Sequence, residues 1–77
     1  MVRVSIVTHL QGSWFVLVDD PGRPGPLLDP APHPVRVCLT RRGNFSYTYA
    51  NGWSRCGAGI THSWRRAIRQ AIASVEA

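Results

Sequence analysis

The chain contains no lysine, and arginine supplies all nine of its basic side chains. Acids are scarce too, since only four oppose the arginines and the net charge is +5. Three of the four acids lie in one proline-rich stretch, residues 19–34, which holds a single arginine, Arg23. A guanidinium is a planar fork that grips phosphates and carboxylates in pairs, so we expect the rest of the chain to seek an anionic partner. The use of arginine instead of lysine also fits a GC-rich genome, so only the excess of charge and its placement bear on function.

Long apolar runs are absent as well. The longest, Trp14 to Val18, is far too short to span a membrane. The N-terminal residues lack the apolar segment and small-residue cleavage site of a secretory signal. We therefore expect a cytoplasmic protein, in the host cytoplasm if it is phage-encoded, with no membrane partner. In a reducing compartment Cys38 and Cys56 should be thiols, although the sequence leaves their pairing open.

No catalytic or metal-binding motif is present. The two cysteines and three histidines form no C-x-x-C and no paired histidine spacing. There is no phosphate-binding glycine loop and no dinucleotide fingerprint. Cys56 and His62 offer a thiol and a base, but nothing in the sequence orients the base. We expect a protein that is not an enzyme and that uses no cofactor and no metal.

The length of 77 residues predicts one domain, residues 1–77, with a small core. All six prolines lie in residues 19–34, where neither a helix nor a central strand can persist. This segment is expected to be a long loop. Its acids leave two interpretations open, a solvated connector or a cover that masks arginines.

Alternating apolar and polar residues predict strands over residues 2–7 and 35–40, and again over 45–50. The turn Arg41 to Asn44 joins the last two into a hairpin, and a further short strand is expected around residues 53–56. A second strand, residues 14–18, is apolar on both faces, which predicts a strand that is central in the sheet or covered on both sides. Residues 9–13 read as a turn.

The end of the chain carries the clearest pattern, an apolar stripe at helical spacing whose first N–H groups Thr61 or Ser63 can cap. We therefore expect an α+β fold, an antiparallel sheet of about four strands (ββ-loop-ββ) with one C-terminal helix packed on one face. Three arginines of this helix lie off the stripe, toward water: Arg65, Arg66 and Arg69. The stripe itself consists of Trp64, Ala67, Ile68, Ala71, Ile72 and Val75.

These helix arginines oppose the helix dipole, because Arg65 and Arg66 stand near its positive end and Glu76 near its negative end. Arg65 and Arg69 are also like charges one turn apart. Stability alone would not select this arrangement. The arginines serve either a partner or an ordinary solvated face.

The predicted sheet offers a second basic surface. If its apolar residues face the helix, the other face is polar and bears arginines, a composition that suits phosphate binding as well as an ordinary solvated sheet. In the alternative pleat, Phe45, Tyr47 and Tyr49 form an exposed stacking platform for single-stranded bases, although such aromatics are more often core. The polar face of the first arrangement comprises Arg3, Ser5, Arg36, Thr40, Ser46 and Thr48, extended by Arg41 and Arg42 at the hairpin.

The chain resembles two kinds of known protein, one in the order of its elements and one in its size and style. The segments RVCLTRRGNFSYTYANGW and THSWRRAIRQAIASV together resemble the sheet-reading DNA-binding domains of integrase arm regions and of a class of plant transcription factors. In size and style the whole chain is similar to small phage or mobile-element inhibitors of the anti-CRISPR kind. That likeness implies a compact α/β domain that disables a host nucleoprotein by occupying a nucleic-acid or subunit site.

We therefore expect a small non-enzymatic binding protein that inhibits a host protein or nucleoprotein complex, most specifically as an anti-CRISPR inhibitor. The alternative is a DNA- or RNA-binding domain that uses the sheet face and the hairpin. Trp53 beside Arg55 is a candidate anchor, because Trp and Arg dominate interface energetics. A homodimer is left open. The expected partner-binding residues are Arg3, Arg36, Arg41, Arg42, Trp53, Arg55, Arg65, Arg66 and Arg69.

Overall fold

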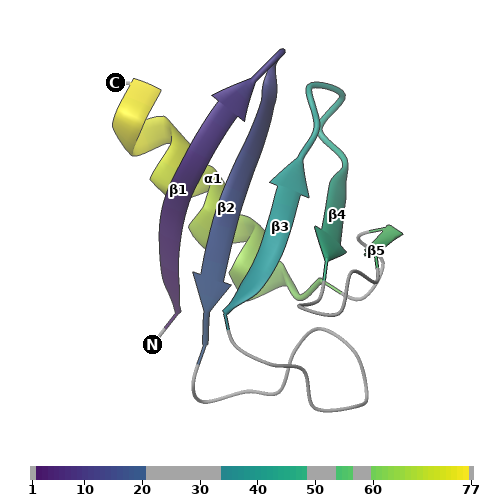
Figure 1. Ribbon diagram of the computed structural model, residues 1–77. Coiled ribbons are helices and arrows are strands. Elements are labelled where there is room, and N and C mark those ends of the chain that lie inside the picture. The colour runs from purple at the N-terminus through teal and green to yellow at the C-terminus, as the bar shows by residue number, and fades with distance from the viewer. Residues whose placement is uncertain (1, 21–33, 49–53, 57–59, 77) are drawn as a thin grey trace.

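A computed structural model describes residues 2–20, 34–48, 54–56 and 60–76. Its elements follow the predicted order, and the α+β fold with one C-terminal helix on an antiparallel sheet is confirmed (Figure 1). They are β1 (Arg3–Leu10), β2 (Ser13–Asp19), β3 (Val35–Leu39), β4 (Phe45–Thr48), β5 (Ser54–Cys56) and α1 (His62–Glu76).

The strands form one antiparallel meander in which each pairs with the next along the chain, in the order β1-β2-β3-β4-β5. The short β5 occupies the place where a brief extra strand was predicted. The backbone of α1 runs closest to β1 and β2, and α1 lies behind the sheet in Figure 1. One face of the sheet is therefore covered by the helix, and we call the other the open face.

The first turn is tighter than predicted. Residues 9–13 were expected to form it, but His9 and Leu10 belong to β1 and the connection is only Gln11 and Gly12. Both have positive φ, at 53° and 79°. A two-residue turn in which both residues have positive φ matches the right-handed twist of the flanking strands, so β1 and β2 remain paired as far as the residues next to the turn. The hairpin between β3 and β4 has its predicted turn, in which Gly43 N–H donates to Thr40 O at 2.8 Å.

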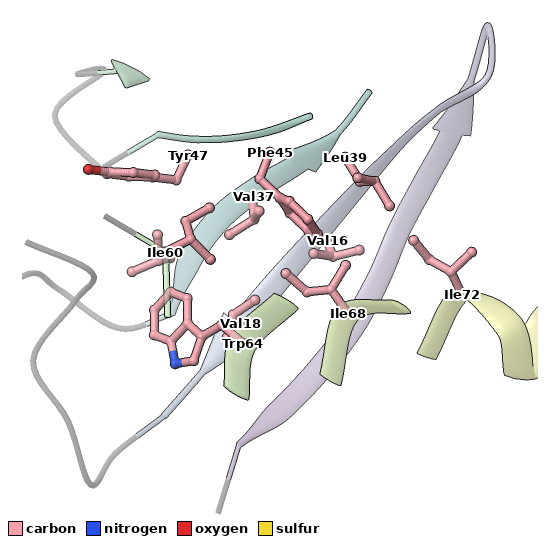
Figure 2. Packing of buried hydrophobic residues seen from close by; sticks show 11 residues of the cluster. Val16, Val18, Val37, Leu39, Phe45, Tyr47, Ile60, Trp64, Ile68 and Ile72 are labelled. Atoms are coloured by element: carbon pink, nitrogen blue, oxygen red, sulfur yellow. The ribbon is translucent and has the colours of Figure 1, made fainter. Parts of the chain in front are cut away.

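The helix begins at a threonine cap, as predicted. Trp64 N–H donates to Thr61 Oγ1 at 3.4 Å, and Arg65 N–H donates to Thr61 O at 3.1 Å. The apolar stripe faces the sheet and buries Trp64, Ile68 and Ile72 (Figure 2). Its last member, Val75, is 57% exposed, so the stripe reaches one turn beyond the sheet that covers it.

The core lies between α1 and the covered face of the sheet. Trp64 and Ile68 pack toward Val16 and Val18 of β2, with Val37 on the adjacent strand (Figure 2). Phe45 and Tyr47 are buried in the same cluster. This contradicts the alternative in which Phe45 and Tyr47 form an exposed stacking platform; Tyr49 lies outside the described residues.

The strand before the proline-rich segment is longer than predicted. Asp19 is the last residue of β2, and Asp20 is only 4% exposed, whereas both were assigned to a loop starting at residue 19. Pairing of Arg3 with Asp19 extends the ladder to that point. Residues 21–33 of the predicted loop lie outside the described residues. Among those described, no helix has the length and apolar character needed to cross a membrane.

Candidate functional site

The arginines predicted to bind a partner do not form one surface. Arg3 and Arg36 lie on the open face, near the ends of β1 and β3 that are remote from the hairpin turns. Arg41 and Arg42 lie in the turn between β3 and β4. Arg55 pairs with Tyr47 across β4 and β5, and Trp53 lies outside the described residues. The remaining predicted arginines lie on α1 and are Arg65, Arg66 and Arg69.

The helix set is built around a buried aromatic ring. The guanidinium carbon of Arg65 lies 5.0 Å from the centroid of Phe45, and that of Arg69 lies 5.1 Å from the same centroid. Arg65 Nε–H also donates to Ile60 O at 3.1 Å. The expectation that all three helix arginines point to water is therefore wrong for Arg65, which is half-buried. Each cation–π contact offsets part of the like-charge cost predicted for these two side chains.

Arg66 completes the set. It is exposed, and together with Arg65, Arg69, His62 and Gln70 it lines a hollow of about 420 Å³ beside the first turns of α1. We call Arg65, Arg66 and Arg69 the helix cluster. The first turn of α1 contains no acidic residue, and the N-terminal end of a helix is itself positive. Charge and geometry at this place both favour an anion.

The hairpin arginines are held differently. A Cβ placed on Gly12 would meet Cβ of Arg41 at 3.1 Å and its Cδ at 3.3 Å, so the Arg41 stem packs against the first turn of the sheet. Arg42 is exposed. Thr40 Oγ1 accepts a bond of 3.1 Å from Asn44 N–H, so Thr40 belongs to this turn, not to a polar sheet face. Arg41 therefore has a packing role, and Arg42 is a solvated charge.

The open face is less polar than predicted. Arg3, Ser5, Arg36, Ser46 and Thr48 share it, as expected, because strand pairing places them at alternating positions. Its centre, however, is apolar. β2 is a central strand, one of the two predicted alternatives, and among the described elements only α1 covers it, on one face. Val7, Phe15 and Leu17 line an open hollow of about 510 Å³ there, with Arg36 and Cys38.

Cys38 is a free thiol at the edge of this hollow. Burial raises the pKa of the thiol, and a hydrogen bond with Ser46 lowers it by less. Cys38 and Cys56 pair with Ser46 from opposite sides, which separates their Cα atoms by about two strand spacings, ~10 Å. A disulfide needs Cα atoms within about 7 Å. Among the described residues, no group of three or more His, Cys, Asp and Glu side chains could hold a metal ion.

No protein-family model, curated protein or solved structure matches this chain. The features that sequence reasoning missed are contacts between distant residues. The Phe45 ring beneath two helix arginines left no sequence signal, because spacing on a helix says nothing about the strand opposite. The apolar centre of the open face did leave one, since Phe15 and Leu17 alternate with Val16 and Val18 in β2.

Proposed function

We propose that the protein is a non-enzymatic binding protein whose helix cluster engages an anionic surface of a partner protein or nucleoprotein complex. The observation that carries the proposal is the placement of Arg65 and Arg69 over one buried ring, at 5.0 and 5.1 Å, with Arg66 exposed beside them. Fixing long side chains before binding reduces the entropy lost on association. A preorganised guanidinium pair suits carboxylates or phosphates at fixed positions.

Inhibition is the expected consequence of such binding. A domain of this size that covers an anion-binding or subunit-binding site would block it by occupancy, without chemistry of its own. Its most specific form is an anti-CRISPR inhibitor that acts in the host cytoplasm. The support for that form is the small basic α+β domain with a compact arginine cluster.

Direct binding of DNA or RNA through Arg3, Arg36, Arg41 and Arg42 is the alternative. The geometry supports it less well, because the first two arginines lie at one end of the sheet and the hairpin pair lies at the other. Val7, Phe15 and Leu17 occupy the centre of the face between them. A backbone-tracking site needs charge along the path of the phosphates.

Two assays test the proposal. Purified RNA-guided effector complexes would be incubated with the protein and target DNA, and cleavage would be followed over time. We expect inhibition that is lost in the Arg66→Gln/Arg69→Gln variant and kept in the Arg41→Gln/Arg42→Gln variant, which removes the same charge. Inhibition that is lost only in the hairpin variant would overturn the assignment of the site, and no inhibition of any effector would overturn the anti-CRISPR form.

The second assay is fluorescence anisotropy with labelled duplex and single-stranded DNA and RNA. Phosphate binding should weaken by roughly 0.9 log units per contact for each tenfold rise in salt. Tight binding with that slope, abolished by Arg41→Gln/Arg42→Gln, would establish the nucleic-acid alternative. We expect weak binding and no dependence on the hairpin.

A further inference from the structure

The open face carries an exposed apolar surface that folding does not require. Val7 is 59% exposed and Phe15 is 39% exposed, and they line one hollow with half-buried Leu17. We call Val7, Phe15 and Leu17 the open-face strip. An antiparallel sheet with one solvated face normally presents polar side chains there. Contiguous exposed apolar residues within a polar surround are typical of interaction sites.

A bulge in β1 places two successive residues, Val7 and Thr8, at the edge of this strip. The pairing of β1 with β2 shifts between Ile6 and Thr8, which leaves Val7 as the extra residue. Val7 and Thr8 both line the hollow, although neighbours in a regular strand point to opposite faces. Val7 follows the alternation of Arg3 and Ser5 and would face this side in a regular strand. The bulge adds Thr8 beside it, while Ile6 remains packed against the core.

Two arginines and one acid border the strip, so the charge around it is positive on balance. Arg36 lines the hollow itself, and its register partner on β2 is Leu17. Arg3 is exposed on the same face, where its partner Asp19 is the one acid among the described strand residues. A second copy of this chain would set Arg36 and a net charge of +5 against the same charge. Like charges across an interface are unfavourable, so the strip favours a partner with apolar and acidic groups together.

The dimensions of the strip favour a helix as that partner. The strip and Arg36 lie on three neighbouring strands, β1, β2 and β3, and two strand spacings amount to about 10 Å. An α-helix with its side chains has a diameter of about 10–12 Å. Among the described elements, none lies over the open face, while α1 covers the opposite one (Figure 1). A second helix would complete a three-layer arrangement.

We propose that the open face binds an amphipathic acidic helix of a partner protein. Its apolar side chains, at i, i+3, i+4 and i+7, would pack on Val7, Phe15 and Leu17. Its carboxylates would meet the guanidinium of Arg36 and that of Arg3. This site is separate from the helix cluster, which lies on α1 behind the sheet, and it does not depend on the function proposed for that cluster.

Single-stranded nucleic acid is the less favoured occupant. Successive bases need successive aromatic rings on which to stack, and the strip offers only the ring of Phe15. Val7 and Leu17 provide contact area but no π face. These aliphatic side chains suit leucine or methionine of a helix better than they suit bases.

The test uses a fluorescein-labelled helical peptide of about five turns, with leucines on one face and glutamates on both flanks. A matched peptide carries lysine in place of glutamate. Binding would be followed by anisotropy for the full chain and for Phe15→Ser and Arg36→Glu. Val75→Ser removes an exposed apolar side chain of α1 instead, and Arg42→Glu makes the same charge change at the hairpin.

We expect the glutamate peptide to bind, with at least about tenfold weaker affinity for Phe15→Ser and Arg36→Glu. The two control variants should bind like the unaltered protein, and Arg36→Glu should gain affinity for the lysine peptide. Binding should persist in the Arg66→Gln/Arg69→Gln variant. Thermal melts establish that each variant is folded.

Four results would overturn the proposal: no binding of the glutamate peptide, equal binding of both peptides, loss of binding only when the helix cluster is changed, or equal losses in the controls. If a single-stranded RNA probe binds the protein but not Phe15→Ser, and the peptide does not bind, the open face would be assigned to nucleic acid. A dimer in solution that Phe15→Ser dissociates would assign it to a second copy of the chain.

Discussion

The indole N–H of Trp64 donates a buried hydrogen bond of 2.9 Å to Oδ2 of Asp20, a residue 44 positions away along the chain. Asp20 directly follows β2, and Trp64 lies in the first turn of α1. The bond therefore ties the start of the helix to the end of a central strand. It fixes the base of α1, from which the helix cluster projects.

Removing the carboxylate should weaken the fold. Asp20→Ala deletes the acceptor of the indole N–H in a buried place, which should cost about 1–3 kcal/mol. Asp20→Asn keeps a carbonyl acceptor and should cost less. Urea unfolding followed by tryptophan fluorescence measures both. Asp19→Ala is the control, because Asp19 is only half-buried and its side chain points away from α1. Equal stability of Asp20→Ala and the unaltered protein would show that the bond has no net effect.

The helix arginines should differ from one another in their effect on stability. Arg66→Gln removes a positive charge near the positive end of the helix dipole, so the variant should be as stable as the unaltered protein or more stable by a few tenths of a kcal/mol. Arg69→Gln removes a cation–π contact with Phe45 and should cost about 0.5–1 kcal/mol before the charge relief. Arg65→Gln removes a similar contact together with the hydrogen bond to Ile60 O, so it should cost more. Thermal and urea melts would rank the three variants. A double-mutant cycle of Arg69→Gln with Phe45→Leu isolates the contact, and a coupling energy near zero would contradict it.

The two turn glycines should respond differently to alanine. Gly43 has φ of 87° and no atom within 4 Å of an added Cβ, so Gly43→Ala meets only backbone strain, roughly 1–2 kcal/mol. Gly12 has φ of 79° and the Arg41 stem at 3.1 Å. Gly12→Ala should therefore be the more destabilising of the pair. If the two variants unfold at the same denaturant concentration, the packing of Arg41 on Gly12 is not significant in solution.

The Cys38 thiol should be slow to react at neutral pH. Burial raises its pKa above the ordinary value of 9.0, and only the thiolate is nucleophilic. In a Cys56→Ser background, alkylation by iodoacetamide should be slower for the folded protein than for the protein in urea. Faster reaction of the folded protein would contradict the raised pKa.

The same shift predicts a pH dependence of stability. A raised pKa means that folding favours the protonated thiol, so this contribution is fully present below pH 9.0 and is lost as the pH rises through the raised value. Unfolding free energies would be compared between the Cys56→Ser protein and the Cys38→Ser/Cys56→Ser protein. The first should lose stability more steeply above that pH, and parallel curves would count against the assignment.

The elements were predictable because their signals are local. Alternation over residues 35–40 and 45–50, and the stripe from Trp64 to Ile72, each require only neighbours on one strand or helix. The two-residue length of the first turn was not predicted because it requires positive φ at Gln11, and glutamine is not a residue that indicates positive φ. Val75 is exposed because the helix extends past the sheet, and the periodicity of the helix sequence does not indicate where the sheet ends.

The candidate sites were less predictable, because they depend on pairing between elements. The arginines themselves are evident in the sequence, but their division among the open face, the hairpin and α1 follows from the strand order. Phe15 is exposed and Leu17 is half-buried because, among the described elements, none covers this face of β2. Asp20 becomes a buried acceptor only because Trp64 packs beside it.

The central claim is that the helix cluster, and not the net charge alone, binds anions. The most direct measurement is the salt concentration at which each protein elutes from a heparin column. Arg66→Gln/Arg69→Gln and Arg41→Gln/Arg42→Gln each remove two charges, from exposed helix positions in one case and from the hairpin turn in the other. We expect the helix variant to elute at clearly lower salt than the hairpin variant. Identical elution of the two would show that only total charge matters and would contradict the assigned site.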